Sequence, residues 1–287
     1  MGRLSLFEAN EKIGGMLRYG IPEFRLPKSI LDKLHKKLVD MDISIRPNTL
    51  IGQVLTIDDL FRDGYKAVFI GTGVWRPRTV NIKGESLGNV HFAIDYLRNP
   101  YSYSLGRKVC IIGAGNVAVD VARTAPRQGS RDVSIMCRDG ASGVSALKHE
   151  IETAKVDGVS FEYYKLPFEF TEKGVIYINR QEIIDQDGNI QVSDIQNSSE
   201  LFQCDSIIVA VSQQARNLIV THTAGIETQE KGLVITDEFG HTTREGVFAA
   251  GDVVTGPKTV VIAVREAKKA ACGIDKYVKE LNRKAES

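Results

Sequence analysis

The stretch that decides the fold is Lys108-Val-Cys-Ile-Ile-Gly-Ala-Gly-Asn-Val-Ala118, an apolar run followed at once by two glycines and a small residue. An apolar run rich in β-branched residues predicts a buried strand of a parallel sheet. Gly113 and Gly115 would allow a tight turn and a close approach to a pyrophosphate, and Ala118 would let the next helix pack on the strand. With a second strand expected at Val133-Ser-Ile-Met-Cys137, the pattern predicts a dinucleotide-binding unit. The alternative is a glycine-rich turn that holds no ligand.

A second unit of this kind begins at the N-terminus, but only its later part is visible. Leu4-Ser-Leu-Phe-Glu8 is an apolar run that ends in an acidic residue, as the second strand of such a unit does. Glu8 would accept hydrogen bonds from a ribose diol. That acidic residue normally follows the glycine turn by about 20 residues, whereas seven residues precede Glu8. We therefore expect the first strand, its turn and its helix to be absent from this sequence or supplied by another chain.

The order of the remaining patterns predicts an α/β fold with two domains. Strand patterns at residues 65–70, 206–211 and 246–252 alternate with helical patterns at 28–41, 145–156 and 259–281, as in folds with parallel sheets. Asp187-Gly188 predicts a hairpin turn between two further strands. Because the Lys108–Ala118 unit lies in mid-chain, we expect an inner nucleotide domain at residues 101–211. The outer domain would join residues 1–100 and 212–287.

Composition narrows the classes of function. The 37 basic and 36 acidic residues give a net charge of +1, which suggests neither a nucleic-acid partner nor a membrane surface. The four cysteines are far apart and include no Cys-x-x-Cys pair, which argues against a thioredoxin-reductase-like enzyme and against a metal site. We expect Cys110, Cys137 and Cys204 to be buried free thiols and the protein to be cytoplasmic.

Four blocks together identify a family: residues 8–28, 67–78, 113–120 and 247–261. They resemble the small (β) subunit of NADPH-dependent glutamate synthase over nearly the whole chain. They are also similar to the matching regions of dihydropyrimidine dehydrogenase and of the large subunit of NADH-dependent ferredoxin–NADP oxidoreductase. The resemblance implies two Rossmann-like domains of the glutathione-reductase type. The NAD(P)-binding domain would be inserted into an FAD-binding domain that lacks its first strand and helix.

The resemblance also implies two sets of cofactor-binding residues. For FAD, Glu8 would bind the adenosine ribose, and the other residues would line the dinucleotide from its adenine half to the flavin. These other residues are Gly14, Gly15, Leu17, Thr72, Gly73, Gly251, Asp252, Thr259 and Val260. For the nicotinamide dinucleotide, the pyrophosphate would lie on Gly113, Gly115, Asn116, Val117 and Ala118.

Arg138, just after the second strand of the inner domain, would pair with the 2′-phosphate of NADP. The sequence departs from the family here, because Asp139 stands where a second arginine is usual. Asp139 could instead accept a ribose diol, so NADP and NAD both remain open. A second departure is Ser212, where the family has glycine.

The implied activity is transfer of a hydride from NAD(P)H to FAD, with electrons leaving to an iron–sulfur or flavin partner subunit. The cofactors carry this chemistry, so no side chain is assigned a catalytic role and no metal site is expected. The alternative is a non-catalytic NAD(P)-binding subunit or fragment that no longer holds FAD. The incomplete FAD sheet would leave open edges for a partner or for self-association.

Overall fold

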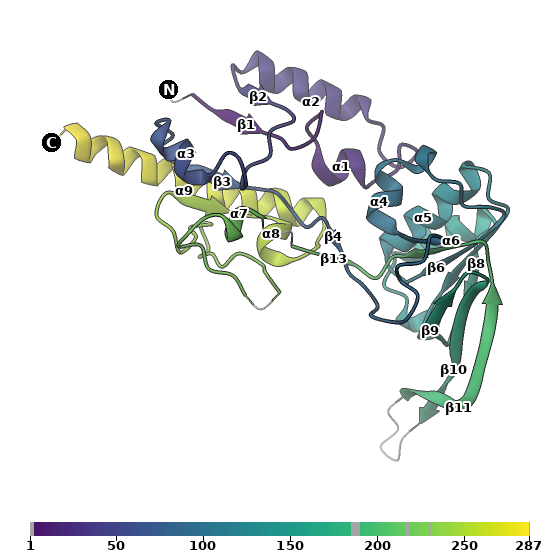
Figure 1. The fold of residues 1–287 in the computed structure, drawn as a ribbon. Helices are drawn as coiled ribbons and strands as arrows, with labels where there is room; N and C mark the ends of the chain where they lie inside the picture. Colours follow the sequence, from purple (N-terminus) through teal and green to yellow (C-terminus); the bar gives the residue numbers. More distant parts are fainter. Residues whose placement is uncertain (1–2, 185–189, 216–217, 230, 287) are drawn as a thin grey trace. The chain divides into compact units, whose positions relative to one another are not determined.

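The computed structural model describes residues 3–184, 190–215, 218–229 and 231–286, and its contacts divide the chain into two compact units (Figure 1). Unit 1 comprises Met1–Arg18, Glu23–Arg76 and Gln213–Ser287, and unit 2 comprises Tyr19–Pro22 and Pro77–Ser212. Residues 77–100 thus group with unit 2 and not with the outer segments where we expected them. The reason is that β5 (Val90–Phe92) pairs with β12 (Ser206–Val209) in the sheet of unit 2.

Unit 2 is built on a five-stranded sheet with the order β5-β12-β6-β7-β8. Its other strands are β6 (Lys108–Ile112), β7 (Asp132–Met136) and β8 (Ser160–Glu162). All neighbours in this sheet run parallel. The helices of unit 2 are α4 (Ala93–Arg98), α5 (Asn116–Arg127) and α6 (Lys148–Val156), with short 3-10 turns at Pro100–Ser102 and Ala141–Gly143. The α/β fold with a parallel sheet predicted from the sequence is confirmed.

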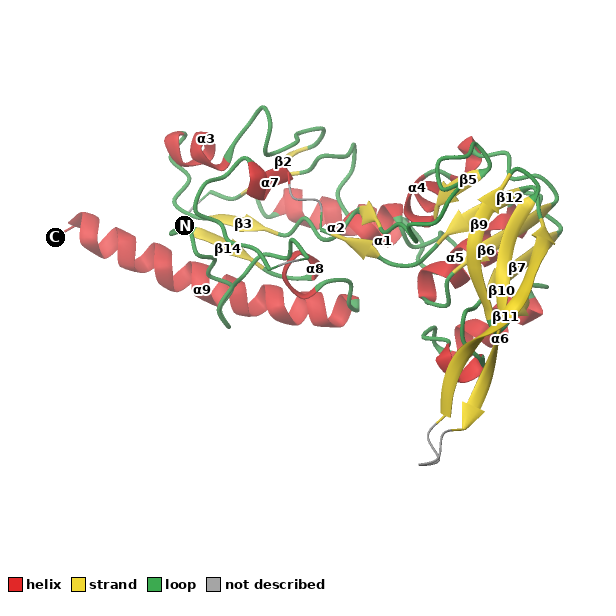
Figure 2. Ribbon diagram, turned by 60° about the horizontal axis from the view of Figure 1, so that its bottom comes forward, coloured by secondary structure: helices red, strands yellow, loops and turns green. Residues whose placement is uncertain are grey.

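Both faces of the parallel sheet are covered, which explains why its central strands β12 and β6 are mostly apolar. Along β6, Val109 and Ile111 belong to the core shared with α5, where Ala118 and Ala122 are fully buried. The alternate residues of β6, Cys110 and Ile112, belong to a second core. That second core is shared with the antiparallel sheet β11-β10-β9, which extends from the parallel sheet in Figure 2.

The antiparallel sheet consists of β9 (Lys165–Thr171), β10 (Gly174–Ile184) and β11 (Ile190–Gln203). β10 pairs with both neighbours, and the register with β11 shifts between Ile178 and Arg180. The predicted turn at Asp187-Gly188 lies outside the described residues. The two strands that it would join are paired as a hairpin requires.

Unit 1 contains two pairs of parallel strands. β1 (Ser5–Phe7) pairs with β2 (Ser44–Arg46), and β3 (Val68–Ile70) pairs with β14 (Val247–Ala249). In the part of the chain that the structure describes, β1 and β3 do not pair with each other, although the Tyr65 hydroxyl donates to Ser5 Oγ at 2.8 Å. A further short pair, β4 (Arg76–Pro77) and β13 (Gln213–Gln214), joins the segments that connect the units.

The helices of unit 1 follow local sequence signals. The predicted helix at 28–41 is α2 (Ser29–Asp40), and the predicted helix at 259–281 is α9 (Val260–Glu286). A capping box between Thr56 and Asp59 starts α3. α9 packs against β14, where Phe248 and Tyr277 form an edge-to-face pair. The short helices are α1 (Gly15–Tyr19), α3 (Ile57–Arg62), α7 (Leu218–Thr221) and α8 (Asp252–Thr255).

All four cysteines are free, and Cys110, Cys137 and Cys204 are buried as predicted. A search of residues 3–286, apart from the three short gaps, finds no helix with the length and apolar character needed to cross a membrane.

Candidate functional site

The glycine turn joins β6 to α5 in unit 2, as the sequence predicts. Gly113 follows β6 with a φ of +136°, and its N–H donates to Met136 O on β7 at 3.2 Å. A Cβ on Gly113 would lie 2.5 Å from the carbonyl oxygen of Ala210, so only glycine fits both the backbone angle and the space. Gly115 is the N-cap of α5. The N–H groups of the first helical turn have no intrahelical acceptor, so this end of α5 can hold a phosphate.

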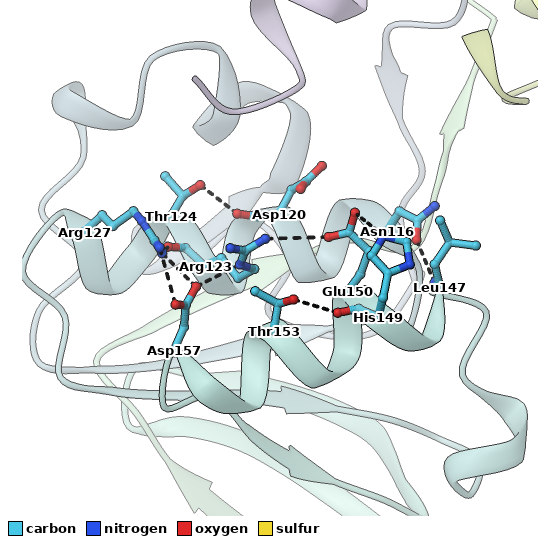
Figure 3. A network of polar contacts seen from close by, with 10 residues as sticks. All are labelled: Asn116, Asp120, Arg123, Thr124, Arg127, Leu147, His149, Glu150, Thr153 and Asp157. Carbon is cyan, nitrogen blue, oxygen red and sulfur yellow. Dashed lines mark hydrogen bonds and ion pairs between the residues drawn. The ribbon is translucent and has the colours of Figure 1, made fainter. Parts of the chain in front are cut away.

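The side chain of Asn116 forms a structural hydrogen bond that the glycine motif does not predict. Its Oδ1 accepts a hydrogen bond from Leu147 N at 3.1 Å, and it thereby ties the start of α6 to the start of α5 (Figure 3). Ala146 N also donates to Ala114 O, at 3.0 Å. A contribution of Asn116 to a dinucleotide would therefore come from its donors, the backbone N–H and the side-chain Nδ2, and not from Oδ1. Ala118 is fully buried against the sheet, as the packing argument expects, and Val117 lies partly buried on the same core.

A partly buried ion-pair network holds α5 and α6 together behind the turn (Figure 3). Arg123 Nε donates to Asp157 Oδ2 at 2.8 Å, and Arg127 Nη1 donates to the same oxygen at 2.9 Å. Arg123 Nη1 also lies 3.6 Å from Glu150 Oε2. The hydrogen bonds from Arg127 and Arg123 lower the pKa of Asp157. This network fixes the helix whose N-terminus would face the phosphates.

Arg138 and Asp139 lie just beyond the carboxyl end of β7, on the loop that leads to α6. Arg138 is 73% exposed, and its Nε donates to Asp139 Oδ2 at 3.0 Å. The other oxygen of Asp139 accepts from Arg180 Nη1 of β10 at 2.9 Å. Arg180 could not be predicted from the sequence, because no local motif marks an arginine in the middle of an antiparallel strand.

In unit 1, the residues expected at FAD follow the carboxyl ends of three strands. Glu8 follows β1, Thr72 comes two residues after β3, and Gly251-Asp252 come just after β14. Ligands of parallel α/β sheets bind at this edge. Glu8 is half-buried, and its Oε1 accepts from the backbone and side-chain nitrogens of Asn10, both at 2.8 Å.

The loop after Glu8 leads into α1, which contains Gly15 and Leu17. Leu17 N donates to Gly14 O at 3.0 Å, and Lys28 Nζ donates to Leu17 O at 2.8 Å. Arg18 adds a bond to Ile13 O at 2.8 Å. These contacts give the glycine loop a defined path after the Glu8 strand.

The remaining residues expected at FAD lie in two further segments, after β3 and after β14. Thr72 O accepts from the indole of Trp75 at 2.9 Å, across Gly73. Gly251 has φ 77° and ψ −153°, a conformation that is essentially confined to glycine. Burial raises the pKa of Asp252, an effect that the N–H of Lys258 partly offsets. Thr259 Oγ1 accepts from Ile262 N at 3.4 Å at the start of α9, and Val260 is 47% exposed there.

The residues expected at FAD all lie in unit 1, and those expected at the nicotinamide dinucleotide all lie in unit 2. The family model described as pyridine nucleotide-disulphide oxidoreductase matches residues 28–267. The chain belongs to this family.

Relatives of known function agree with the resemblance drawn from the four blocks. The small chain of glutamate synthase [NADPH] from Halomonas elongata is 30% identical, over 95% of this chain and 62% of its own length. The beta subunit of an NADP(+)-dependent formate dehydrogenase from Moorella thermoacetica is 32% identical, over 97% of this chain and 41% of its own. The chain therefore spans less than two thirds of the length of either relative. Among solved structures, Mycobacterium tuberculosis FprA in complex with NADPH superposes with a TM-score of 0.79 at 18% identity, over 99% of this chain and 79% of that one. This likeness concerns the fold and confirms the predicted α/β class.

Proposed function

We propose that this chain is the reductase part of an NADPH-dependent flavin oxidoreductase similar to the glutamate synthase small chain. The observation that carries the proposal is the turn between β6 and α5, with a glycine-only contact at Gly113 and an exposed Arg138 beyond β7. The turn and the helix N-terminus suit a pyrophosphate, and a guanidinium suits a 2′-phosphate.

The residues of unit 1 fit parts of FAD. Glu8 would hold the adenosine ribose through the carboxylate oxygen that Asn10 leaves unbound in its two contacts. Asp252 and the start of α9 at Thr259 would serve the ribityl chain and the flavin, since a helix N-terminus stabilises negative charge at the flavin edge. When bound, FAD supplies the capacity to accept a hydride and to release electrons singly. The protein's own task is to bind and orient the two cofactors.

The electrons would pass to an iron–sulfur or flavin centre of a partner subunit. Support comes from the names of the relatives, which are a small chain and a beta subunit of larger enzymes. The free cysteines suit the reducing, cytoplasmic setting that we propose.

The test is the visible spectrum of the purified protein with saturating FAD, before and after anaerobic addition of NADPH. We expect flavin bands that remain after gel filtration and that NADPH bleaches. A protein that binds NADPH but retains no flavin would support the alternative, a non-catalytic NAD(P)-binding subunit. A protein that binds neither would contradict both.

A further inference from the structure

Arg180 connects three parts of unit 2 at the end of β7. It lies on β10, and its side chain is 17% exposed. Its Nη1 donates to Arg138 O at 3.0 Å and to Asp139 Oδ1 at 2.9 Å. Its Nε donates to Asp194 Oδ1 at 2.8 Å, and its Nη2 donates to Val192 O at 3.2 Å, both on β11. Every nitrogen of this guanidinium therefore has a protein acceptor, so Arg180 is not placed to bind a ligand directly.

The contacts of Arg180 change what Asp139 can do. An acid that recognises NAD accepts hydrogen bonds from the ribose hydroxyls, so its oxygens must be available. Here Oδ1 of Asp139 accepts from Arg180 and Oδ2 accepts from Arg138. Both oxygens are thus engaged by guanidinium groups, and the charge of the carboxylate is compensated on both sides. This arrangement disfavours the interpretation of Asp139 as the ribose acceptor.

The same contacts also hold Arg138 in place. Its backbone carbonyl is held by Arg180, and its Nε is held by Asp139. Among the residues that the structure describes, no hydrogen bond to its Nη1 or Nη2 is found, and the side chain is 73% exposed. Two parallel Nη–H groups on a fixed guanidinium are suited to a phosphate.

The antiparallel sheet supports this loop at several points. Lys165 N donates to Cys137 O at 3.0 Å, and Arg180 N donates to Tyr164 O at 2.8 Å. A Cβ on Gly140 would lie 2.0 Å from the Tyr164 hydroxyl, so the loop lies directly against the start of β9. Of the residues that hold this loop from the antiparallel sheet, Arg180 is the one whose charged side chain contacts Asp139.

We propose that Arg180 is a positioning residue that sets the preference for NADPH over NADH. It does so by engaging Asp139 and by orienting Arg138 toward the 2′-phosphate. The inference rests on the proposed function, because it requires the dinucleotide to bind at the end of β6 and β7.

The experiment measures dissociation constants of NADPH and NADH for the whole chain by isothermal titration calorimetry. We expect the wild type to prefer NADPH and Arg180→Met to reduce the preference about tenfold, the scale of one charge-assisted contact. Arg180→Lys should restore part of the preference, because it keeps the charge without the planar fork. The matched control is Arg107→Met, which removes another arginine–carboxylate pair of unit 2, the pair with Asp132 at the amino end of β7, and should leave the ratio unchanged.

A double-mutant cycle tests the route through Asp139. In an Asp139→Ala background, Arg180→Met should change the NADPH-to-NADH ratio much less than in the wild type. If the Arg180→Met variant fails to fold, the same cycle can be measured with Arg180→Lys in the wild-type and Asp139→Ala backgrounds. An unchanged ratio in Arg180→Met and Arg180→Lys, or full additivity with Asp139→Ala, would overturn the inference while leaving the proposed function intact. A wild type that binds neither nucleotide would overturn the proposed function and this inference with it.

Discussion

Gly113 and Ala210 approach each other so closely that a Cβ on residue 113 would lie 2.5 Å from the Ala210 carbonyl oxygen. This contact joins the glycine turn to the end of the neighbouring strand, where Ala210 N donates to Ile112 O at 2.8 Å. Gly115, two residues on, has no such constraint. Its φ is −99°, and a Cβ there would meet Ser145 Oγ at 3.6 Å, an ordinary contact. The two glycines of one motif therefore serve different purposes.

Alanine substitutions should separate these purposes. Gly113→Ala is expected to lower the free energy of unfolding by about 2–4 kcal/mol, because of the clash and the positive φ. Gly115→Ala should stay within about 1 kcal/mol of the wild type and weaken NADPH binding, because the methyl group would stand where the pyrophosphate approaches. Urea denaturation and calorimetric titration measure the two effects. Equal destabilisation by both variants, or unchanged NADPH binding in Gly115→Ala, would contradict this division.

Arg138→Ala should weaken NADPH binding more than NADH binding. Loss of a charge-assisted pair costs about 1.5–3 kcal/mol, so the dissociation constant of NADPH should rise roughly 10- to 150-fold, whereas that of NADH should change by less than about twofold. The measurement is titration of each nucleotide before and after the change. An equal loss for both nucleotides would show that Arg138 is not the phosphate anchor.

The Asp157 carboxylate should make the stability of unit 2 depend on pH. The hydrogen bond from Arg127, followed by that from Arg123, lowers the pKa of Asp157 in the folded state below 3.8. Its stabilising contribution is therefore fully present above the unfolded pKa and is lost as the pH falls through the folded pKa. Asp157→Asn should lower the free energy of unfolding by about 1–3 kcal/mol at pH 7. The difference in this free energy between the variant and the wild type should shrink as the pH falls below about 4.

Denaturation curves from pH 7 down to the acid transition provide the measurement. Asp275→Asn is the control, because Asp275 pairs with Lys279 on an exposed face of α9. This substitution should change the free energy of unfolding by less than about 0.5 kcal/mol. A penalty for Asp157→Asn that does not change with pH would show that the packing of the side chain, and not its charge, is responsible.

Ser212 has a φ of +100°, a conformation that costs energy for any residue with a Cβ. Ser212→Gly, which restores the residue that the family resemblance expects, should raise the free energy of unfolding by about 1 kcal/mol. Ser160→Gly in β8 is the matched control, since Ser160 is not among the positive-φ residues and glycine weakens a strand. If Ser212→Gly is no more stable than the wild type, the positive φ is not a source of strain.

Features that depend on neighbouring residues were predictable from the sequence. The period of apolar residues located α2 and α9, and the Lys108–Ala118 stretch located β6, the turn and α5. These signals are readable because strand burial, helix amphipathicity and the glycine turn are each specified within about a dozen residues. The fold class follows from their order along the chain.

Other features were decided only by tertiary contacts. Arg180 lies 42 residues from Arg138, and Leu147 lies 31 residues from Asn116, yet each pair is joined by a hydrogen bond. Residues 77–100 join unit 2 because β5 completes the edge of its sheet. No local pattern encodes these partners, because strand neighbours and side-chain contacts depend on how the whole unit packs. The sequence by itself determined the strand, turn and helix at which we propose that a dinucleotide binds. Only the packing of the antiparallel sheet against the β7 loop decided how Arg138 and Asp139 are held there.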